Sequence, residues 1–204
     1  MAKTLVTFTG PSGCGKSTVV RLLYTKYPDV FSEMVSTTTR APRALEVEGV
    51  AYYFVSQDEF ESRSVAGMFL EEVLYNGTRY GIEKREVNRV LMQGCTPLLI
   101  VEPHGARQIR ERYAGPLIQL FIKPPSEEHL RTWMAGRGDS PETIERRIQL
   151  DRSVFNPNDG HPWTKVIENN DLETVCGEIL TLLGMEDLQT RRSTYPCDER
   201  LSSA

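Results

Sequence analysis

A glycine-rich stretch near the start of the chain, GPSGCGKST at residues 10–18, restricts the possible folds more than any other feature. It matches Gly-x-x-x-x-Gly-Lys-Ser at every fixed position. The short, β-branched run Thr4–Thr9 precedes it, and Lys16–Tyr27 follows with apolar residues at helical spacing. A strand, a glycine loop and a helix in this order make backbone N–H groups converge on phosphate oxygens. The sequence therefore predicts a nucleotide site.

Two side chains of this loop have distinct expected roles. Lys16 adds a mobile cation, and the Ser17 hydroxyl can reach a magnesium ion, so we expect Ser17 to be a metal ligand and Mg²⁺ to be the cofactor. The positive end of the following helix points at the same anion. The expected nucleotide-binding residues of the loop are Gly10, Pro11, Ser12, Gly13, Cys14, Gly15, Lys16, Ser17 and Thr18, with Cys14 interpreted as a small filler.

The rest of the chain alternates apolar strands with helical patterns, which predicts an α/β fold: a P-loop NTPase-type parallel sheet with helices on both faces. The further strand candidates are Pro97–Val101, Leu117–Ile122 and Thr164–Glu168. The helical patterns are Glu83–Gln93, His104–Tyr113, Ser126–Gly136, Pro141–Phe155 and Leu172–Leu183.

Three segments interrupt this alternation. Residues 35–82 indicate an inserted α+β lobe, with turns at Asn76-Gly77 and near Gly49. A second, charged break at Arg137–Thr143 lies between two helical patterns. Residues 185–204 are polar and aperiodic, so we expect a loosely attached tail. The core is then formed by residues 1–34 and 83–184.

The composition is that of one ordinary globular domain. The 204 residues are 39% hydrophobic and 25% charged, with a formal net charge of −4. This acidic balance argues against nucleic acid as a partner, and no apolar run approaches the roughly 18 residues that a membrane span needs. The four cysteines are widely spaced, and the N-terminus runs directly into a strand. We therefore expect reduced thiols, no signal peptide, a cytoplasmic location, and a monomer or homodimer.

Arg40 and Arg43 stand three residues apart with Pro42 between them, which indicates a rigid loop. Two guanidinium groups placed in this way could bind one phosphate through paired hydrogen bonds. Taken alone, the pair is more typical of two solvated surface arginines.

Several further motifs accompany these arginines. In chain order they read GPSGCGKST, STTTRAPR, EVEGVAYYFV, FLEE, RYG, PPS, GRG and VIENNDLE. In residue type and order, over about residues 4 to 183, the chain resembles guanylate kinases. The resemblance implies an enzyme with three parts: a core that binds ATP, an inserted lobe that binds a nucleoside monophosphate, and a lid that closes over both.

The resemblance also implies individual roles. The acceptor phosphate would be held by Arg40, Arg43, Tyr52 and Tyr80, and the guanine would meet Ser36 and Glu71. Lys16, Arg137 and Arg147 would bridge the transferring phosphoryl group with help from Arg43, and Asn169 would lie near the adenine. Gly81, Ile82 and Glu102 complete the expected acceptor site. A carboxylate at Glu71 suits guanine, because it accepts hydrogen bonds from the ring N–H and the exocyclic amine together.

Five positions depart from the family pattern. Ile82 stands where a serine or threonine hydroxyl usually meets the guanine 6-oxygen, and Ile100 and Glu102 replace two aspartates. His104 replaces a common glutamine, and Trp133 replaces an arginine. We interpret Ile100 as a buried strand residue and His104 as a surface residue at a helix start. Trp133 fits either core packing or contact with a base or sugar, and of the two we favour packing.

Three functions are compatible with these residues. The first is ATP-dependent phosphorylation of a purine nucleoside monophosphate, GMP or dGMP. The second is the same reaction on a 2-amino purine nucleotide with an altered 6-position, because Glu71 is present without a hydroxyl at Ile82. The third is a non-catalytic peptide-binding module, although such modules generally lose the phosphate loop.

Overall fold

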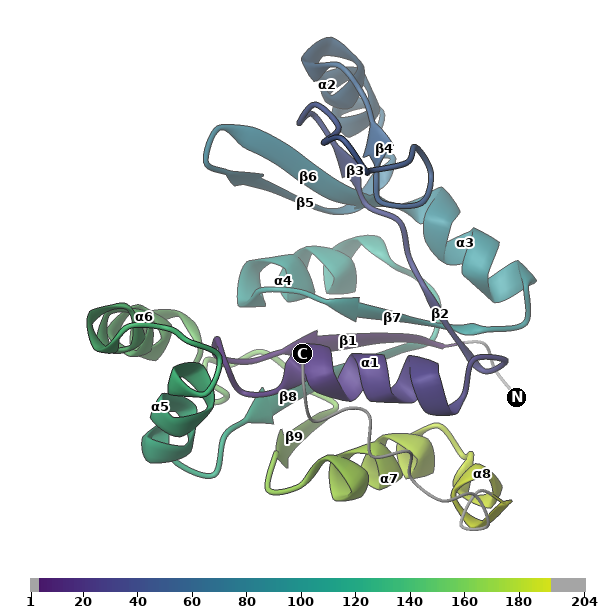
Figure 1. The fold of residues 1–204 in the computed structure, drawn as a ribbon. Helices are drawn as coiled ribbons and strands as arrows, with labels where there is room; N and C mark the ends of the chain where they lie inside the picture. Colours follow the sequence, from purple (N-terminus) through teal and green to yellow (C-terminus); the bar gives the residue numbers. More distant parts are fainter. Residues whose placement is uncertain (1–3, 192–204) are drawn as a thin grey trace.

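The computed structural model describes residues 4–191. A parallel sheet of five strands lies at its centre, in the order β2-β7-β1-β8-β9 (Figure 1). In that order the strands are Phe31–Glu33, Thr96–Ile100, Leu5–Thr9, Leu117–Lys123 and Lys165–Glu168. All five residues of β1 are buried, as expected for a central strand covered on both sides.

Helices cover both faces of this sheet. Alternate residues of β1 point to opposite faces, so they pack against different helices. Val6 and Phe8 pack in one cluster with α1 (Lys16–Lys26) and α7 (Leu172–Leu182). Leu5 packs in a second cluster with α3 (Lys84–Met92) and α4 (Pro103–Arg112). The predicted α/β class with a parallel sheet is confirmed.

A second sheet, of four strands, lies beyond α4 (Figure 1). Its order is β4-β3-β6-β5, and the strands are Tyr53–Phe54, Thr37–Thr38, Thr78–Glu83 and Phe69–Tyr75. Helix α2 (Gln57–Val65) precedes β5. The hairpin β5–β6 turns at Asn76 and Gly77, which have φ values of 48° and 75°. Asn-Gly is the pair that such a two-residue turn favours.

Helices α5 (Glu127–Ala135) and α6 (Pro141–Val154) pack on each other. The charged break predicted from the sequence begins between them. Each begins at a serine whose hydroxyl accepts a backbone N–H: Ser126 from His129 and Ser140 from Thr143. This is the usual way to satisfy a helix start. The connection between them is short, because only residues 136–140 separate the two helices.

The tail prediction is wrong for its first residues. Glu186–Arg191 forms a short helix, α8, and Leu188 packs on the core through neighbouring α7 residues. The remainder of the predicted tail, including Cys197, lies outside the described residues. Cys14, Cys95 and Cys176 are free thiols. Between residues 4 and 191, no helix is long and apolar enough to cross a membrane.

Candidate active site

The phosphate loop joins the end of β1 to the start of α1, and its shape depends on glycine at two places. Gly10 and Gly15 have φ values of 149° and 92°. A Cβ at Gly10 would collide with the Ile122 carbonyl oxygen, and one at Gly15 would collide with the Asn169 amide. Since an L side chain fits at neither position, the loop lies directly against β8 and the residues after β9.

The ammonium group of Lys16 is bound by carbonyl oxygens of its own loop. Lys16 Nζ donates to the carbonyl oxygens of Gly10 at 2.6 Å and Pro11 at 2.7 Å. Ser17 is exposed at the N-terminal end of α1, where backbone N–H groups are free of helical partners. Cys14 is fully buried, as expected for a filler, and burial raises the pKa of its thiol.

One acid in contact with the loop was not expected from the sequence. Asp151, on α6, is only 9% exposed, and its Oδ2 accepts the backbone N–H of Ser12 at 2.6 Å. The signal was present in the sequence, because Asp151 continues the apolar stripe of Ile144 and Ile148 at helical spacing. A charged residue on the buried side of an amphipathic helix has a specific partner, because burying it unpaired is costly.

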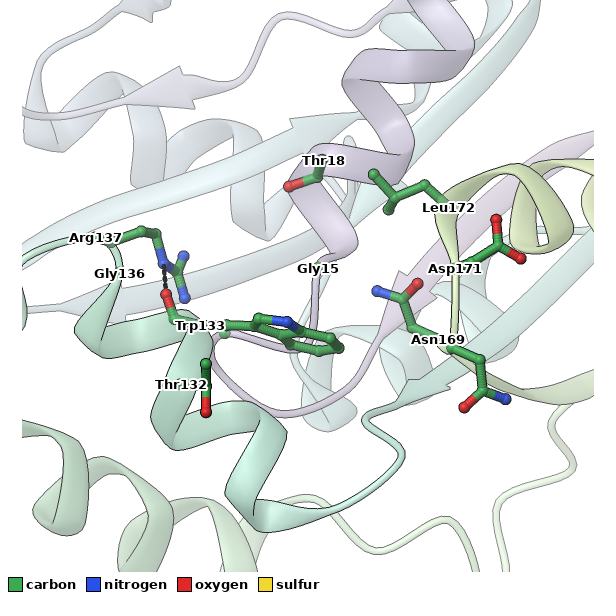
Figure 2. A pocket seen from close by; sticks show the side chains of 11 residues that line it. Gly15, Thr18, Thr132, Trp133, Gly136, Arg137, Asn169, Asp171 and Leu172 are labelled. Atoms are coloured by element: carbon green, nitrogen blue, oxygen red, sulfur yellow. Dashed lines mark hydrogen bonds between the residues drawn. The ribbon is translucent and has the colours of Figure 1, made fainter. Parts of the chain in front are cut away.

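A cavity of about 530 Å³ opens beside the loop (Figure 2). The residues that line it are Gly13, Gly15, Thr18, Thr132, Trp133, Gly136, Arg137, Asn169, Asn170, Asp171 and Leu172. Trp133 packs partly on the hydrophobic core, as expected, and its indole also extends from α5 toward Asn169 and lines the cavity. Asn169 is buried and donates through Nδ2 to the Cys14 carbonyl at 2.8 Å, which braces the loop.

The two lid arginines differ in their surroundings. The Arg137 guanidinium lies beside the loop, because a Cβ at Gly13 would be 2.9 Å from its Nη2. Arg147 instead donates to Asp139 Oδ2 at 3.0 Å, within the α5–α6 region. The structure thus brings Arg137 to the loop and leaves Arg147 in an ion pair.

The second sheet gathers Arg40, Tyr52 and Tyr80. The Arg40 guanidinium lies 5.3 Å from the Tyr52 ring centroid, and the rings of Tyr52 and Tyr80 are 6.0 Å apart. Arg40 also donates to both oxygens of Glu46, at 2.9 and 2.7 Å. Those bonds, with one from the Arg43 backbone N–H, lower the pKa of Glu46 to about 2. The sequence analysis did not identify Glu46. Its carboxylate accepts the paired hydrogen bonds from the Arg40 guanidinium that a phosphate could also accept.

Arg43 takes part in this cluster only through its backbone, and its side chain is exposed. Ser36 is half-buried, and its carbonyl accepts the Tyr53 N–H at 2.9 Å. Gly81 is buried, and a Cβ there would lie 2.8 Å from the Phe69 ring. Gly81 therefore lets β6 approach the neighbouring side chains closely.

A second cavity, of about 340 Å³, lies between the β5–β6 hairpin and the start of α4. Its lining residues are Glu71, Val73, Leu74, Tyr75, Tyr80, Ile100, Val101, Glu102, His104 and Gly105. Ile100 lines it and is 37% exposed, so the interpretation of Ile100 as a buried strand residue is wrong. His104 is exposed near the start of α4, as expected.

The surroundings of Glu71 in this cavity raise the pKa of its carboxyl group. Its side chain packs on Gly105, where a Cβ would be 2.8 Å from Glu71 Cγ. Burial, followed by the charges of Glu102 and Glu72, raises the pKa of Glu71 to about 7. Ile82 pairs with Glu71 across the hairpin, so both point to one face of the sheet. Ile82 is only 2% exposed and lies in the hydrophobic cluster, beneath the cavity rather than in its lining.

A phosphate loop after the first strand of a parallel sheet, braced by Asn169 and with Arg137 beside it, is the arrangement of a P-loop nucleotide-binding protein. The family model described as guanylate kinase matches residues 1–186. The chain belongs to the guanylate kinase family, so the resemblance drawn from its motifs is confirmed.

Relatives and solved structures agree with this assignment. A guanylate kinase of Symbiobacterium thermophilum is 39% identical over 93% of this chain and 88% of its own length. One of a Nostoc species is 44% identical over 86% of each chain. The crystal structure of guanylate kinase from Anaplasma phagocytophilum superposes with a TM-score of 0.57, at 25% identity, over 96% of this chain and 97% of its own.

Proposed function

We propose that this protein transfers the γ-phosphate of ATP to GMP or dGMP, giving ADP and GDP or dGDP. One observation carries the proposal: a complete phosphate loop and a separate cavity with a half-buried carboxylate, Glu71, occur in the same chain. Relatives named guanylate kinase, 39% identical over most of the chain, support the same conclusion. Neither alternative function has comparable support.

The acceptor binds in the lobe at residues 35–82, with its base in the second cavity. Ionised Glu71 accepts the ring N–H and the 2-amino group of guanine, and Ser36 and Glu102 border the base. Tyr80 lines this cavity and also belongs to the cluster of Arg40 and Tyr52, so the base and phosphate positions adjoin. The acceptor phosphate replaces Glu46 on Arg40, with Arg43 joining from solvent.

The donor binds at the loop, with its triphosphate on the N-terminal end of α1. Lys16 leaves its carbonyl partners for the phosphates, and Arg137 and Arg147 approach the transferring group from the lid at about 137–145. Phosphoryl transfer needs in-line positioning and cations around developing charge more than covalent help. This requirement accounts for the arginines that surround the site in an otherwise acidic protein.

Magnesium fits this site as a companion of the nucleotide. In residues 4–191, no group of three His, Cys, Asp or Glu side chains could hold a metal alone. The exposed Ser17 hydroxyl can supply one oxygen ligand, and nucleotide phosphates would supply others. When bound, Mg²⁺ neutralises charge on the β- and γ-phosphates. A cytoplasmic location and a monomer or homodimer are part of the same proposal.

A panel of acceptors tests the proposal. Purified protein with Mg²⁺ and ATP should form ADP quickly with GMP or dGMP, slowly with AMP, and very slowly without an acceptor. The panel should include 2,6-diaminopurine nucleoside monophosphate, which is the acceptor of the second alternative. No acceptor-dependent ADP formation with any purine monophosphate would contradict the kinase function and favour the peptide-binding alternative.

A further inference from the structure

We infer that Trp133 is the platform on which the donor nucleobase stacks, and that the donor site consequently discriminates weakly between nucleobases. The inference rests on the proposed function, because it needs a nucleoside triphosphate in the cavity beside the loop. It concerns a residue where this chain departs from the arginine common in the family.

The placement of Trp133 is the first observation. Its indole lines the 530 Å³ cavity together with Gly13 and Gly15 of the loop on one side and the Asn169–Leu172 segment on the other (Figure 2). A base attached to a triphosphate at the loop has this cavity beside it. The indole offers a flat apolar surface of the size of a nucleobase there.

The support behind the indole is the second observation. The next residue, Met134, is fully buried, which fixes this turn of α5 against the core. The His129 ring, one helical turn earlier, meets the indole edge-on, with centroids 5.8 Å apart and planes at 65°. Trp133 is thus held in position before a ligand arrives, so stacking costs little ordering.

The polar groups around the cavity are the third observation, because most of their donors already have partners. Asn169 Nδ2 donates to the Cys14 carbonyl at 2.8 Å, and Asn170 Nδ2 to Glu168 Oε1 at 3.1 Å. The Thr132 hydroxyl donates to the Glu128 carbonyl at 3.0 Å. Asp171 Oδ1 accepts two N–H groups at the start of α7, at 2.9 and 3.3 Å.

These engagements leave few side-chain donors in the cavity to recognise acceptor atoms on the edge of a base. Stacking on an aromatic side chain contributes strongly to binding and tolerates any base, because every base has a π-face. A site built in this way holds the donor by the face of its base and by its phosphates.

Binding measurements separate stacking from a purely structural role. Calorimetry with Mg²⁺ compares the parent, Trp133→Phe and Trp133→Leu, using ADP and inorganic tripolyphosphate as ligands. Trp133→Phe should bind ADP within about threefold of the parent, and Trp133→Leu about tenfold or more weakly. Tripolyphosphate, which has no base, should bind all three proteins alike. Equal weakening of both ligands in Trp133→Leu, or no weakening of ADP, would overturn the inference.

Fluorescence gives a second readout. Trp163 is the other tryptophan, and its buried Nε1 has no hydrogen-bond partner, so Trp163→Phe is a matched control that removes its signal without losing a hydrogen bond. In that variant ADP should quench the Trp133 emission directly. An unchanged emission at saturating ADP would contradict stacking.

Donor selectivity completes the test. ATP, ITP and CTP should give kcat/KM values within about thirtyfold of one another in the parent, since stacking tolerates each base. A preference for ATP of a thousandfold or more would overturn the inference. Failure of ADP and tripolyphosphate to bind the parent at all would instead reject the proposed function.

Discussion

At the scale of single residues, Lys16 holds its ammonium group between two carbonyl oxygens of its own loop, at 2.6 and 2.7 Å. We propose that in the reaction the same group stabilises charge on the transferred phosphoryl group. We predict that Lys16→Ala lowers kcat about a hundredfold or more, as loss of a transition-state cation does. Steady-state kinetics with GMP, together with GMP binding measured by calorimetry, check this prediction. A kcat within tenfold of the parent, which is about 1.4 kcal/mol of barrier, would contradict it.

The proposed contact of Glu71 with guanine predicts that acceptor binding depends on pH. Burial and the neighbouring acids raise its pKa to about 7, so the carboxyl is largely neutral below that pH and ionised above it. Only the carboxylate accepts both guanine donors. We therefore predict that kcat/KM for GMP rises between about pH 6 and pH 8, with KM for ATP nearly constant.

Two variants control this pH profile. Glu71→Gln should bind GMP weakly and lose the step in the profile. Glu102→Gln removes one charge that raises the pKa of Glu71, so its step should move to lower pH. An identical step in the parent and Glu71→Gln would show that the titrating group is not Glu71.

The sequence predicted some of these residues and not others, for physical reasons. The loop could be assigned because glycine and lysine at fixed spacing are required by its geometry. The positions of Ile100 and Trp133 depend on where a strand end and a helix face lie relative to cavities, and one sequence contains no such information. The burial of Ile82 beneath Glu71 follows from the packing of α3 and α4 on the second sheet.

At the scale of elements, helix α6 places a negative charge against the phosphate loop. Asp151 accepts the Ser12 N–H at 2.6 Å, so a triphosphate at the loop meets a carboxylate. A charge pair at about 4 Å is worth about 1 kcal/mol even in water, or roughly a fivefold change in affinity. We predict that Asp151→Asn, which can still accept the N–H, binds ADP and inorganic tripolyphosphate roughly fivefold more tightly.

Calorimetry of both ligands at two salt concentrations checks the effect of Asp151, since the gain should shrink as salt screens the charge. Weaker binding by Asp151→Asn would show that the carboxylate helps the loop to bind phosphate. Glu142→Gln, also on α6, is a matched control, because Glu142 is exposed and does not contact the loop.

The bounds of some helices and strands agree with those predicted from the sequence better than the bounds of others. Helices α1, α3 and α5 to α7 lie within about two residues of their predicted bounds, because each has a 3.6-residue apolar period. Strands β2 and β3 have three and two residues, which is too short for alternation to appear. Helix α8 is polar, and its position on α7 depends on Met185 and Leu188 rather than on a period.

At the scale of the whole molecule, the cavities proposed for the donor and the acceptor belong to different parts of the chain. The first lies among the loop, α5 and the start of α7, and the second lies between the β5–β6 hairpin and α4. Three cationic side chains proposed for transfer or acceptor binding donate hydrogen bonds to the protein itself. Lys16 donates to backbone carbonyls, Arg40 to Glu46 and Arg147 to Asp139. We expect these three cations to exchange their protein partners for phosphate oxygens when the substrates bind.

Such an exchange predicts closure of the lobe and the lid. A bisubstrate analogue that joins adenosine and guanosine through a chain of phosphates should bridge both cavities. It should draw Arg40 and Arg147 toward the same anion and exclude water, so that ATP is not hydrolysed. Small-angle scattering should then give a smaller radius of gyration than that of the free protein, whereas GMP alone should give a smaller change. Arg147→Ala should bind the analogue but close less completely, because its lid lacks one phosphate contact. An unchanged radius in the parent at saturating analogue would mean that the two cavities already have their reactive separation, and that the ion pairs of Arg40 and Arg147 persist during catalysis.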